Sequence, residues 1–382
     1  MNTSTTDLGP NSCLVGRSGS RLQLNSPALL LDLDAFERNV TAMATRLRNF
    51  GLNLRPHAKA HKSGVVGRKQ IEAGAVGISC ANLDEAEAMA RGGVDSILVT
   101  SPVVGSSAIE RLVAIAGNAG DVITVADHPD NVDALSACAR ATGVTLGVLV
   151  DIDVGQHRTG VTSEEAAIEL ATRVTAAGGV QYRGVQAYYG HLQHIAAYAD
   201  RRKAVDDKLA ILRATIDALG KAGHAPSIVS GGGTGTFHID ASAGVHTELQ
   251  PGSYLLMDRQ YADVELTPDG TCPFEQALFV QTTVVSVNQP GLAVVHGGWK
   301  AFATESGVPV VAKGAPPNAV YEFMGDEHGG LHLPPGNEAL ELGSIVEFVP
   351  PHCDPTVNLF SRFHCVRGDD LVDIWPIEAR GY

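Results

Sequence analysis

Hydrophobic residues in the first two thirds of the chain alternate between short runs and helical spacing. Leu29–Leu33 is a largely apolar run that predicts a strand, and Asp34 behind it is of a type that often caps a helix start. The next apolar residues recur at spacings of four, three and four, which places them on one face of a helix. They are Phe36, Val40, Met43 and Leu47.

Eight more strand candidates follow, and helical stretches such as 106–117, 163–177 and 197–222 separate most of them. They are Asn53–Ala58, Val76–Cys80, Ser96–Thr100, Val122–Ala126, Leu146–Ile152, Gly184–Tyr189, Ile228–Gly231 and Glu248–Tyr254. Strands that alternate with helices predict a parallel sheet of the α/β class. A (β/α)8 barrel holds one strand fewer than this series, so we expect the first strand to lie outside it, where it can pair with the C-terminal domain.

The pattern changes near residue 265, where helical spacing nearly disappears. The β-like segments beyond it are Ala277–Val287, Leu292–Val295, Val308–Val311, Ser344–Val349 and His364–Val366. We therefore expect a flexible N-terminal tail at 1–24, a (β/α)8 TIM barrel at 25–260 and a smaller all-β C-terminal domain at 261–382.

Composition and charge narrow the function classes. A chain of 382 residues with 44% hydrophobic and 18% charged residues can build a sizeable core. Its net charge of −14 argues against nucleic acid and against an anionic membrane surface as partners. The six cysteines are scattered without a CxxC pair, no apolar run is long enough to span a membrane, and residues 1–20 lack the apolar centre of a signal peptide. We expect a cytoplasmic protein with reduced thiols.

The segment from Arg55 to Lys62 is rich in cations. On a strand, alternate residues share a face, so Arg55, His57 and Lys59 would point together into the barrel mouth. A lysine among other cations has a lowered pKa, and a neutral amine is what Schiff-base chemistry needs. The alternative is a solvated basic patch on an acidic protein.

Two glycine-containing segments are candidates for holding a phosphate. Ser230–Thr236 carries three consecutive glycines after an apolar strand, and Gln250–Tyr254 ends the next strand. Glycines let backbone N–H groups converge on an anion. These segments follow barrel strands seven and eight, where (β/α)8 enzymes commonly bind phosphate, although a flexible loop is the alternative.

A triplet near the C-terminus is a candidate metal site. Prolines on both sides of His352, Cys353 and Asp354 predict an extended backbone, in which His352 and Asp354 face one way and Cys353 the other. One imidazole and one carboxylate favour Mn²⁺ or Mg²⁺ with open positions. The alternative is a turn in which Asp354 caps local N–H groups.

Three further segments carry polar side chains of uncertain role. Gly190–His194 ends a barrel strand, so His191 or His194 could supply a general base. Arg158 follows another strand and could contact a cofactor ring or pair with an acid. The acidic segment 326–329 is either a turn or part of a pocket rim.

Together these segments resemble the D-threonine aldolase family. It is a branch of the fold-type III enzymes that use pyridoxal 5′-phosphate (PLP), and that group also includes D-serine dehydratases. The resemblance runs from about Pro27 to Gly381. Its motifs are Arg55-Pro56-His57-Ala58-Lys59-Ala60-His61-Lys62, Gly184-Val185-Gln186-Ala187-Tyr188, Gly231-Gly232-Gly233-Thr234-Gly235, Thr247-Glu248-Leu249-Gln250-Pro251-Gly252-Ser253-Tyr254, Asp326-Glu327-His328-Gly329 and His352-Cys353-Asp354-Pro355-Thr356.

The resemblance implies roles for residues around the cofactor. Lys59, not Lys62, matches the Schiff-base lysine, and Arg158 matches the partner of the pyridine nitrogen. The phosphate contacts it implies are Tyr188, Gly233, Thr234, Gly252, Ser253 and Tyr254. It further implies a head-to-tail homodimer with active sites between subunits.

The resemblance also implies that His352 and Asp354 bind a divalent metal, Mn²⁺ or Mg²⁺, and that His194 matches the last residue of the family's Gly-x-x-Gln-His segment. The chain departs from the family at His296-Gly297-Gly298-Trp299-Lys300, where Asp-Ala-Gly-x-Lys is common. Because of Trp299 and His191, the resemblance does not specify which side chain the substrate carries.

The implied reaction is retro-aldol cleavage of a β-hydroxy D-amino acid, D-threonine-like, to glycine and an aldehyde. The metal would acidify the β-hydroxyl and His194 would take its proton. A first alternative is a β-hydroxyaspartate aldolase that releases glyoxylate. A second is a D-serine or 3-hydroxyaspartate dehydratase, whose relatives carry His-x-Cys ligands where this chain has Asp354. A third is a non-enzymatic PLP-binding protein; such relatives lack the β domain and the metal pair, so residues 265–382 speak against it.

Overall fold

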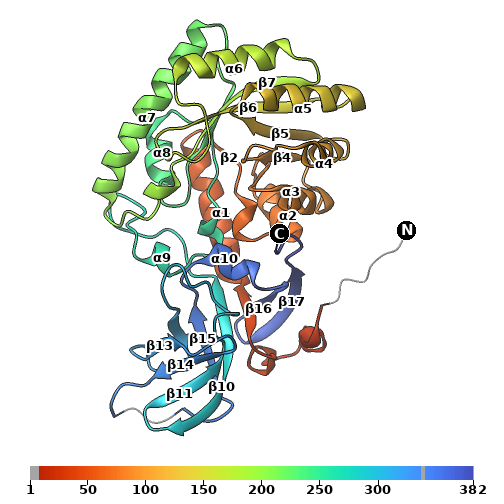
Figure 1. The fold of residues 1–382 in the computed structure, drawn as a ribbon. Helices are drawn as coiled ribbons and strands as arrows, with labels where there is room; N and C mark the ends of the chain where they lie inside the picture. Colours follow the sequence, from red (N-terminus) through yellow and green to blue (C-terminus); the bar gives the residue numbers. More distant parts are fainter. Residues whose placement is uncertain (1–7, 337–339, 382) are drawn as a thin grey trace.

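A computed structural model of the chain describes residues 8–336 and 340–381. Figure 1 shows helices wrapped around a curled sheet at one end of the molecule and a β-rich part at the other end. Within the described residues, no helix combines the length and the apolar character that a bilayer crossing requires.

The first sheet is the predicted barrel. Its strands are β2 (Asn53–Leu54), β3 (Ile78–Cys80), β4 (Ser96–Val99), β5 (Asp121–Ala126), β6 (Leu146–Ile152), β7 (Val180–Ala187), β8 (Ile228–Gly231) and β9 (Glu248–Leu249). The strands pair in parallel in the order β2-β9-β8-β7-β6-β5-β4-β3. A bridge between His57 and Ser79 joins the two ends of this order and closes the barrel. The (β/α)8 fold is therefore confirmed.

Helices cover the outside of the barrel. They are α1 (Leu33–Asn49), α2 (Gly64–Glu72), α3 (Leu83–Arg91), α4 (Ser106–Ala116), α5 (Pro129–Thr142), α6 (Glu164–Ala176), α7 (Tyr198–Lys221) and α8 (Phe237–Ala243), with the short α9 (Arg259–Ala262) after the last strand. Strand β6 is buried at every position, as expected for a strand covered on both faces. Leucine, valine and isoleucine side chains between strands and helices form the core of this part.

The start of α1 differs from the expectation. Asp32, not Asp34, is the N-cap, and its Oδ1 accepts hydrogen bonds from the backbone N–H groups of Asp34 and Ala35, both at 3.1 Å. The helix therefore begins at Leu33, earlier than an N-cap at Asp34 would allow, and the Leu33 side chain is buried. Asp34 instead lies in the first turn and forms an ion pair with Arg367.

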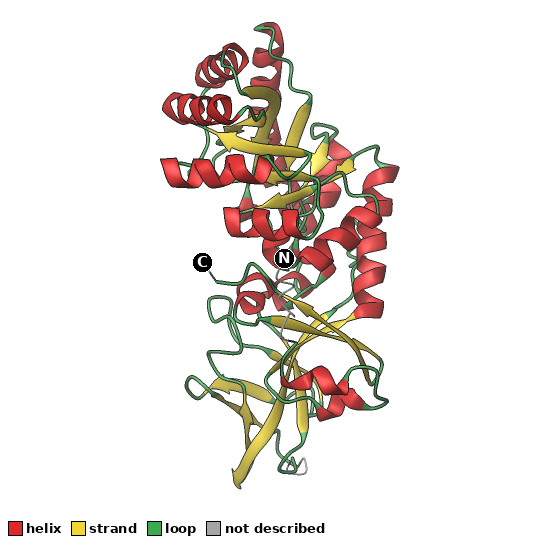
Figure 2. Ribbon diagram, turned by 90° about the vertical axis from the view of Figure 1, so that its right-hand side faces the viewer, coloured by secondary structure: helices red, strands yellow, loops and turns green. Residues whose placement is uncertain are grey.

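The second sheet holds β1 (Ala28–Asp32) and the strands of the C-terminal part. These are β10 (Leu278–Gln289), β11 (Leu292–His296), β12 (Val310–Lys313), β13 (Val320–Phe323), β14 (His328–His332), β15 (Ile345–Val349), β16 (Arg362–Arg367) and β17 (Asp370–Pro376). Strand β1 pairs with β10 and β16, so it lies outside the barrel. Figure 2 shows this sheet below the barrel. A boundary near residue 260, between β9 and β10, remains our proposal for dividing the chain.

Sequence patterns missed three strands and a helix in this part. Strand β14 contains Gly329 and Gly330, which lower strand propensity, β13 is only four residues long, and β17 contains Asp370, Asp373 and Pro376, which are also depleted in strands. The short helix α10 (Cys353–Asn358) was expected to be extended.

The N-terminal segment is not a free tail where the structure describes it. Residues 10–14 and 20–23 form short 3₁₀ helices. The Arg21 guanidinium is buried and donates to both carboxylate oxygens of Glu347 in β15, at 2.8 and 2.6 Å. This ion pair and the burial of Leu14 fix the segment on the second sheet, which the Ser- and Gly-rich composition did not reveal. Residues 1–7 lie outside the described part of the chain.

Candidate active site

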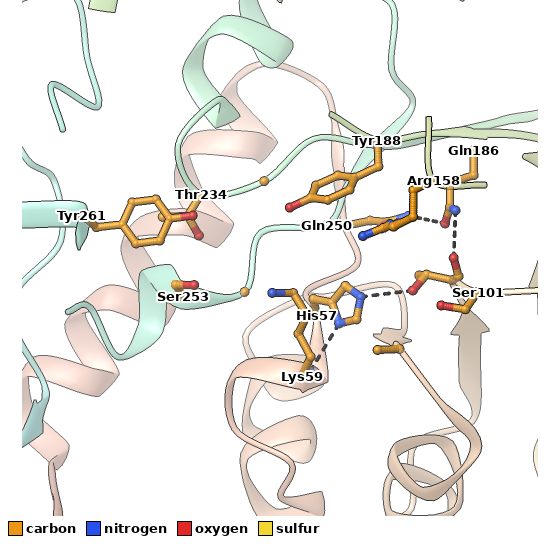
Figure 3. Close-up of a pocket in the computed structure, with 14 residues that line it drawn as sticks. His57, Lys59, Ser101, Arg158, Gln186, Tyr188, Thr234, Gln250, Ser253 and Tyr261 are labelled. Atoms are coloured by element: carbon orange, nitrogen blue, oxygen red, sulfur yellow. Dashed lines mark hydrogen bonds between the residues drawn. The ribbon is translucent and has the colours of Figure 1, made fainter. Parts of the chain in front are cut away.

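A cavity opens at the carboxyl ends of the barrel strands, and its empty volume, with the solvent at its mouth included, is about 590 Å³. Most of its wall comes from loops that follow β2, β4, β6, β7, β8 and β9, as Figure 3 shows. The lining residues are His57, Lys59, Ala81, Thr100, Ser101, Arg158, Gln186, Tyr188, Gly233, Thr234, Gln250, Gly252, Ser253 and Tyr261.

Lys59 lines this cavity, but not from a strand. It lies in a short 3₁₀ turn, Ala58–Ala60, which the ring of His57 caps by accepting the N–H of Lys59 at 3.3 Å. Arg55, which was expected beside Lys59 at the barrel mouth, does not line the cavity. The Arg55 guanidinium is buried inside the barrel and donates to Glu248 and Ser96 at 2.8 and 2.9 Å.

The charge environment of Lys59 also differs from the expectation. Burial on its own would lower the pKa of Lys59, but the ammonium forms an ion pair with the Asp354 carboxylate, and the pKa is raised. Burial and the neighbouring Lys59 lower the pKa of His57 to about 3, so His57 is neutral and adds no positive charge. The expectation of a cation-depressed lysine is therefore wrong for this arrangement.

Lys62 is turned away from the cavity. Its ammonium donates to Glu85 Oε1 at 2.8 Å, and both side chains are buried. Arg158, in contrast, lines the cavity and lies with its guanidinium carbon 5.5 Å from the ring centre of Tyr188.

The two glycine-containing loops meet at one end of the cavity. Gly233, Thr234, Gly252 and Ser253 line it, and the backbone N–H groups of Thr234, Gly252 and Ser253 have no hydrogen-bond partner among the described residues. Free N–H groups on two neighbouring loops of one cavity suit an anion. Tyr254 lies elsewhere: its hydroxyl accepts from Gln70 at 3.1 Å and its N–H donates to Thr234 Oγ1 at 3.1 Å, so it does not line the cavity.

A buried network holds the first glycine loop in place. Gln193 Oε1 accepts the N–H of Gly235 at 2.9 Å, and Gln193 Nε2 donates to Thr236 Oγ1 at 3.0 Å. Thr236 donates in turn to Asp240 at 2.6 Å. Burial raises the pKa of Asp240 to about 7. The segment that precedes His194 is thus bonded directly to the glycine loop.

The triplet His352, Cys353 and Asp354 lies close to Lys59. Asp354 pairs with Lys59, and Ser253 Oγ lies 3.5 Å from its Oδ1. The backbone is not extended through the triplet, because α10 begins at Cys353 with His352 as its N-cap residue. Pro355 fits there since the first turn of a helix needs no N–H donors.

Cys353 does not face away from the carboxylate as expected. Its thiol is buried and donates to Asp354 Oδ1 at 3.2 Å, while its N–H donates to the buried Asp258 carboxylate at 2.8 Å. Within residues 8–336 and 340–381, no group of three or more His, Cys, Asp or Glu side chains is placed to hold a metal ion. His352 and Asp354 could therefore supply two protein ligands, and their nitrogen and oxygen donors fit a hard or borderline divalent ion.

His194 lies beside this pair and outside the cavity lining. Its ring centre is 6.5 Å from that of His352 and 4.6 Å from that of Tyr261. His191 is solvent-exposed. In segment 326–329, Asp326 and Glu327 form a bend and pair with Lys300, while His328 and Gly329 begin strand β14, and the segment contributes nothing to the cavity wall.

Sequence reasoning missed part of the cavity floor. Gln250 Nε2 donates to Gln186 Oε1 at 3.2 Å, and Gln186 Nε2 donates to Asp151 at 3.0 Å. His57 faces Thr100 Oγ1 at 3.2 Å. The signal for the two glutamines was an amide side chain inside an otherwise apolar strand motif.

The residues present fit PLP. An amine on Lys59, free N–H donors in the glycine loops and a guanidinium on Arg158 stand around one cavity, as an aldehyde, a phosphate and a ring nitrogen require. Position 233 of the cavity wall is a glycine for a steric reason, because a Cβ there would lie 2.5 Å from Gln193 Oε1.

Comparison with known proteins gives a consistent result. Residues 31–260 match the family model described as alanine racemase, N-terminal domain, and residues 277–366 match the putative serine dehydratase domain. A 3-hydroxy-D-aspartate aldolase of Paracoccus denitrificans (strain Pd 1222) is 39% identical over 363 residues, 94% of this chain and 93% of its own. A D-threonine aldolase of an Arthrobacter species is 36% identical over 360 residues, 94% of each. The crystal structure of D-threonine aldolase from Filomicrobium marinum matches with a TM-score of 0.88 at 38% identity, over 94% of this chain and 96% of that one.

Proposed function

Since the chain belongs to the D-threonine aldolase family, we propose that it is a PLP- and metal-dependent lyase that cleaves a β-hydroxy D-amino acid to glycine and an aldehyde. The observation that carries this proposal is the convergence of Lys59, the glycine loops and the His352–Asp354 pair at one cavity mouth. An amine, an anion cradle and a metal-binding pair together are what this cleavage needs.

The cofactor residues have separate tasks. Lys59 supplies the amine for the cofactor aldehyde, and Thr234, Gly252 and Ser253 donate to the phosphate. Arg158 would face the ring nitrogen, and because a guanidinium only donates hydrogen bonds, it would keep that nitrogen unprotonated. When bound, PLP supplies an electron sink for the carbanion that bond cleavage leaves.

His352 and Asp354 would hold the metal ion. A divalent ion there lowers the pKa of a coordinated hydroxyl, which is the acidification that retro-aldol cleavage requires. The Lys59–Asp354 ion pair supports this placement, because it keeps the carboxylate next to the amine that would hold the cofactor aldehyde. Mn²⁺ or Mg²⁺ suits the nitrogen and oxygen donors.

His194 is our choice for the base that accepts the β-hydroxyl proton. It lies beside the metal pair, and Gln193 next to it is bonded to the glycine loop. Its backbone is therefore held beside the glycine loop. A general base must lie within hydrogen-bond reach of the proton that it removes.

A second substrate is favoured by the relative from Paracoccus denitrificans, which is a 3-hydroxy-D-aspartate aldolase. Cleavage of β-hydroxyaspartate would release glyoxylate, and it requires a cationic group for the distal carboxylate. A dehydratase outcome is less well supported, because the third residue of the triplet is Asp354 and not a cysteine.

We further infer a head-to-tail homodimer, since the family resemblance places active sites between subunits. Sedimentation that finds an active monomer would contradict this. We also infer a cytoplasmic location, which the free state of all six cysteines supports.

Metal removal tests the proposed function. Exhaustive dialysis against EDTA should abolish aldehyde release from β-hydroxy D-amino acids while the visible absorbance of the bound cofactor persists, and added Mn²⁺ should restore release. Asp354→Ala should behave like the dialysed enzyme. Cys353→Ser is the matched control, because a serine hydroxyl can still donate to Asp354, so it should stay active and metal-dependent. Full activity without metal would refute the mechanism.

A further inference from the structure

Glu305 is the one acidic side chain among the described residues that hydrogen-bonds the ring of His352. Its Oε1 lies 2.7 Å from His352 Nδ1. The Glu305 side chain is 53% exposed and that of His352 is 24% exposed. Glu305 lies in the loop after β11, far in sequence from the triplet, and none of the motifs described above includes it.

This hydrogen bond determines which nitrogen of His352 is free. A carboxylate only accepts hydrogen bonds, so Nδ1 must carry the hydrogen and donate it in the hydrogen bond to Glu305. In the neutral imidazole the lone pair is then on Nε2. His352 Nε2 makes no hydrogen bond to the described residues, so it is available to a metal ion.

The loop that carries Glu305 is fastened on both sides of this residue. Before it, the N–H of Ala303 donates to Thr356 Oγ1 in α10 at 3.1 Å. After it, the carbonyl of Val308 accepts from Arg259 Nη1 in α9 at 3.1 Å. Helix α9 also holds the segment before His352, because the N–H of Arg259 donates to the carbonyl of Pro350 at 3.1 Å. The carboxylate and the imidazole are thus supported by the same two helices.

We propose that Glu305 is a positioning residue for the metal site, which fixes the tautomer and the ring orientation of His352 so that Nε2 faces the ion. The proposal rests on the proposed function, since it presumes a metal at His352 and Asp354. A carboxylate on the remote nitrogen of a metal-binding histidine orients the ring and raises its basicity, and losing such a partner typically weakens metal binding by about 10- to 100-fold.

Binding of Mn²⁺ alone to the metal-stripped enzyme tests the proposal without any turnover. Free Mn²⁺ measured by electron paramagnetic resonance gives the dissociation constant of each variant. Glu305→Ala should weaken binding by about 10- to 100-fold, and Glu305→Gln should recover much of the loss, because the amide oxygen still accepts from Nδ1. Glu341→Gln, which removes an exposed charge in the same part of the chain, should bind like the wild type.

The outcomes separate the two proposals. If the wild type itself binds no Mn²⁺, or if His352→Ala binds it normally, the metal site and the proposed function both fail. If the wild type binds and Glu305→Ala binds equally well, the positioning role of Glu305 is refuted while the metal site stands. The thermal midpoint of Glu305→Ala should stay close to that of the wild type, because a half-exposed pair contributes little to stability. A large loss of stability would mean that Glu305 holds the loop together instead of aiming the histidine.

Discussion

Replacing Gly235 by alanine should damage the active site through a backbone clash. A Cβ at this position would lie 1.9 Å from the carbonyl oxygen of Gln193, 2.7 Å from its carbonyl carbon and 2.9 Å from its Cα. These are backbone atoms and cannot rotate away. Since real Cβ contacts essentially never fall below 3.0 Å, the two segments must separate by about 1 Å. Gly235 does not have a positive φ, so the steric overlap is the only strain introduced.

The displaced segment contains both Gln193, which holds the glycine loop, and His194, the proposed base. Gln193 precedes His194, and its side chain accepts the N–H of Gly235 and donates to Thr236. A shift of about 1 Å between catalytic groups can cost ~10²-fold in rate, and overpacking a core costs about 1–3 kcal/mol in stability. We therefore expect Gly235→Ala to lose about 100-fold or more in kcat/KM and to bind PLP more weakly.

The assay is aldehyde release together with the PLP dissociation constant, with Gly220→Ala as the control. Gly220 lies near the end of α7 with no atom within 4 Å of its would-be Cβ, so alanine should leave activity unchanged and raise helix stability slightly. If Gly235→Ala matched the wild type in both measurements, the close packing and hydrogen bonds between the glycine loop and the His194 segment would be irrelevant to function. The reasoning would then be wrong.

Three further outcomes follow from buried charges and from the proposed base. Lys62→Ala should keep PLP bound through Lys59, yet lower the free energy of unfolding by about 3–5 kcal/mol because Glu85 loses its buried partner; a loss of cofactor absorbance would instead implicate Lys62. Burial raises the pKa of Asp240 to about 7, so the folded protein retains a proton that the unfolded chain releases. The contribution of this carboxyl to stability should therefore fall between about pH 4 and pH 7, by on the order of 4 kcal/mol. The free energy of unfolding of Asp240→Asn, measured with urea, should lack that dependence on pH. His194→Asn should slow cleavage by about 10²–10⁴-fold, and near-normal turnover would exclude it as the base.

The barrel could be predicted because its strands and helices have periodic patterns, but the loops at its mouth could not. Two strand candidates, Asn53–Ala58 and Glu248–Tyr254, are strands for only two residues each. Pro56 and Pro251 have no N–H to continue the ladder, and the regular strands end before them, at Leu54 and Leu249. Those early strand ends create the turns that bring Lys59 and Ser253 to the cavity, so prediction failed where the site is built.

Site residues that belong to a motif were predictable, and those that act through a distant partner were not. Motif positions led to Lys59 and Thr234, both of which line the cavity. Asp258 and Glu305 bond to groups 95 and 47 positions away, and nothing in their own neighbourhood indicates it. Their importance depends on tertiary contacts that periodicity does not encode.

The charge on Lys59 shows why local composition was the wrong basis for predicting a pKa. The expectation placed Lys59 among the cations of the segment from Arg55 to Lys62, but each of the others is neutralised in the fold. Arg55 and Lys62 are paired with Glu248 and Glu85, and burial lowers the pKa of both His57 and His61 to about 3. Asp354, 295 positions away, is the charge that remains next to the amine. The direction of the Lys59 pKa shift is therefore set by Asp354. Because Asp354 belongs to the β-rich C-terminal part, that part helps to set the chemistry of the lysine in the barrel.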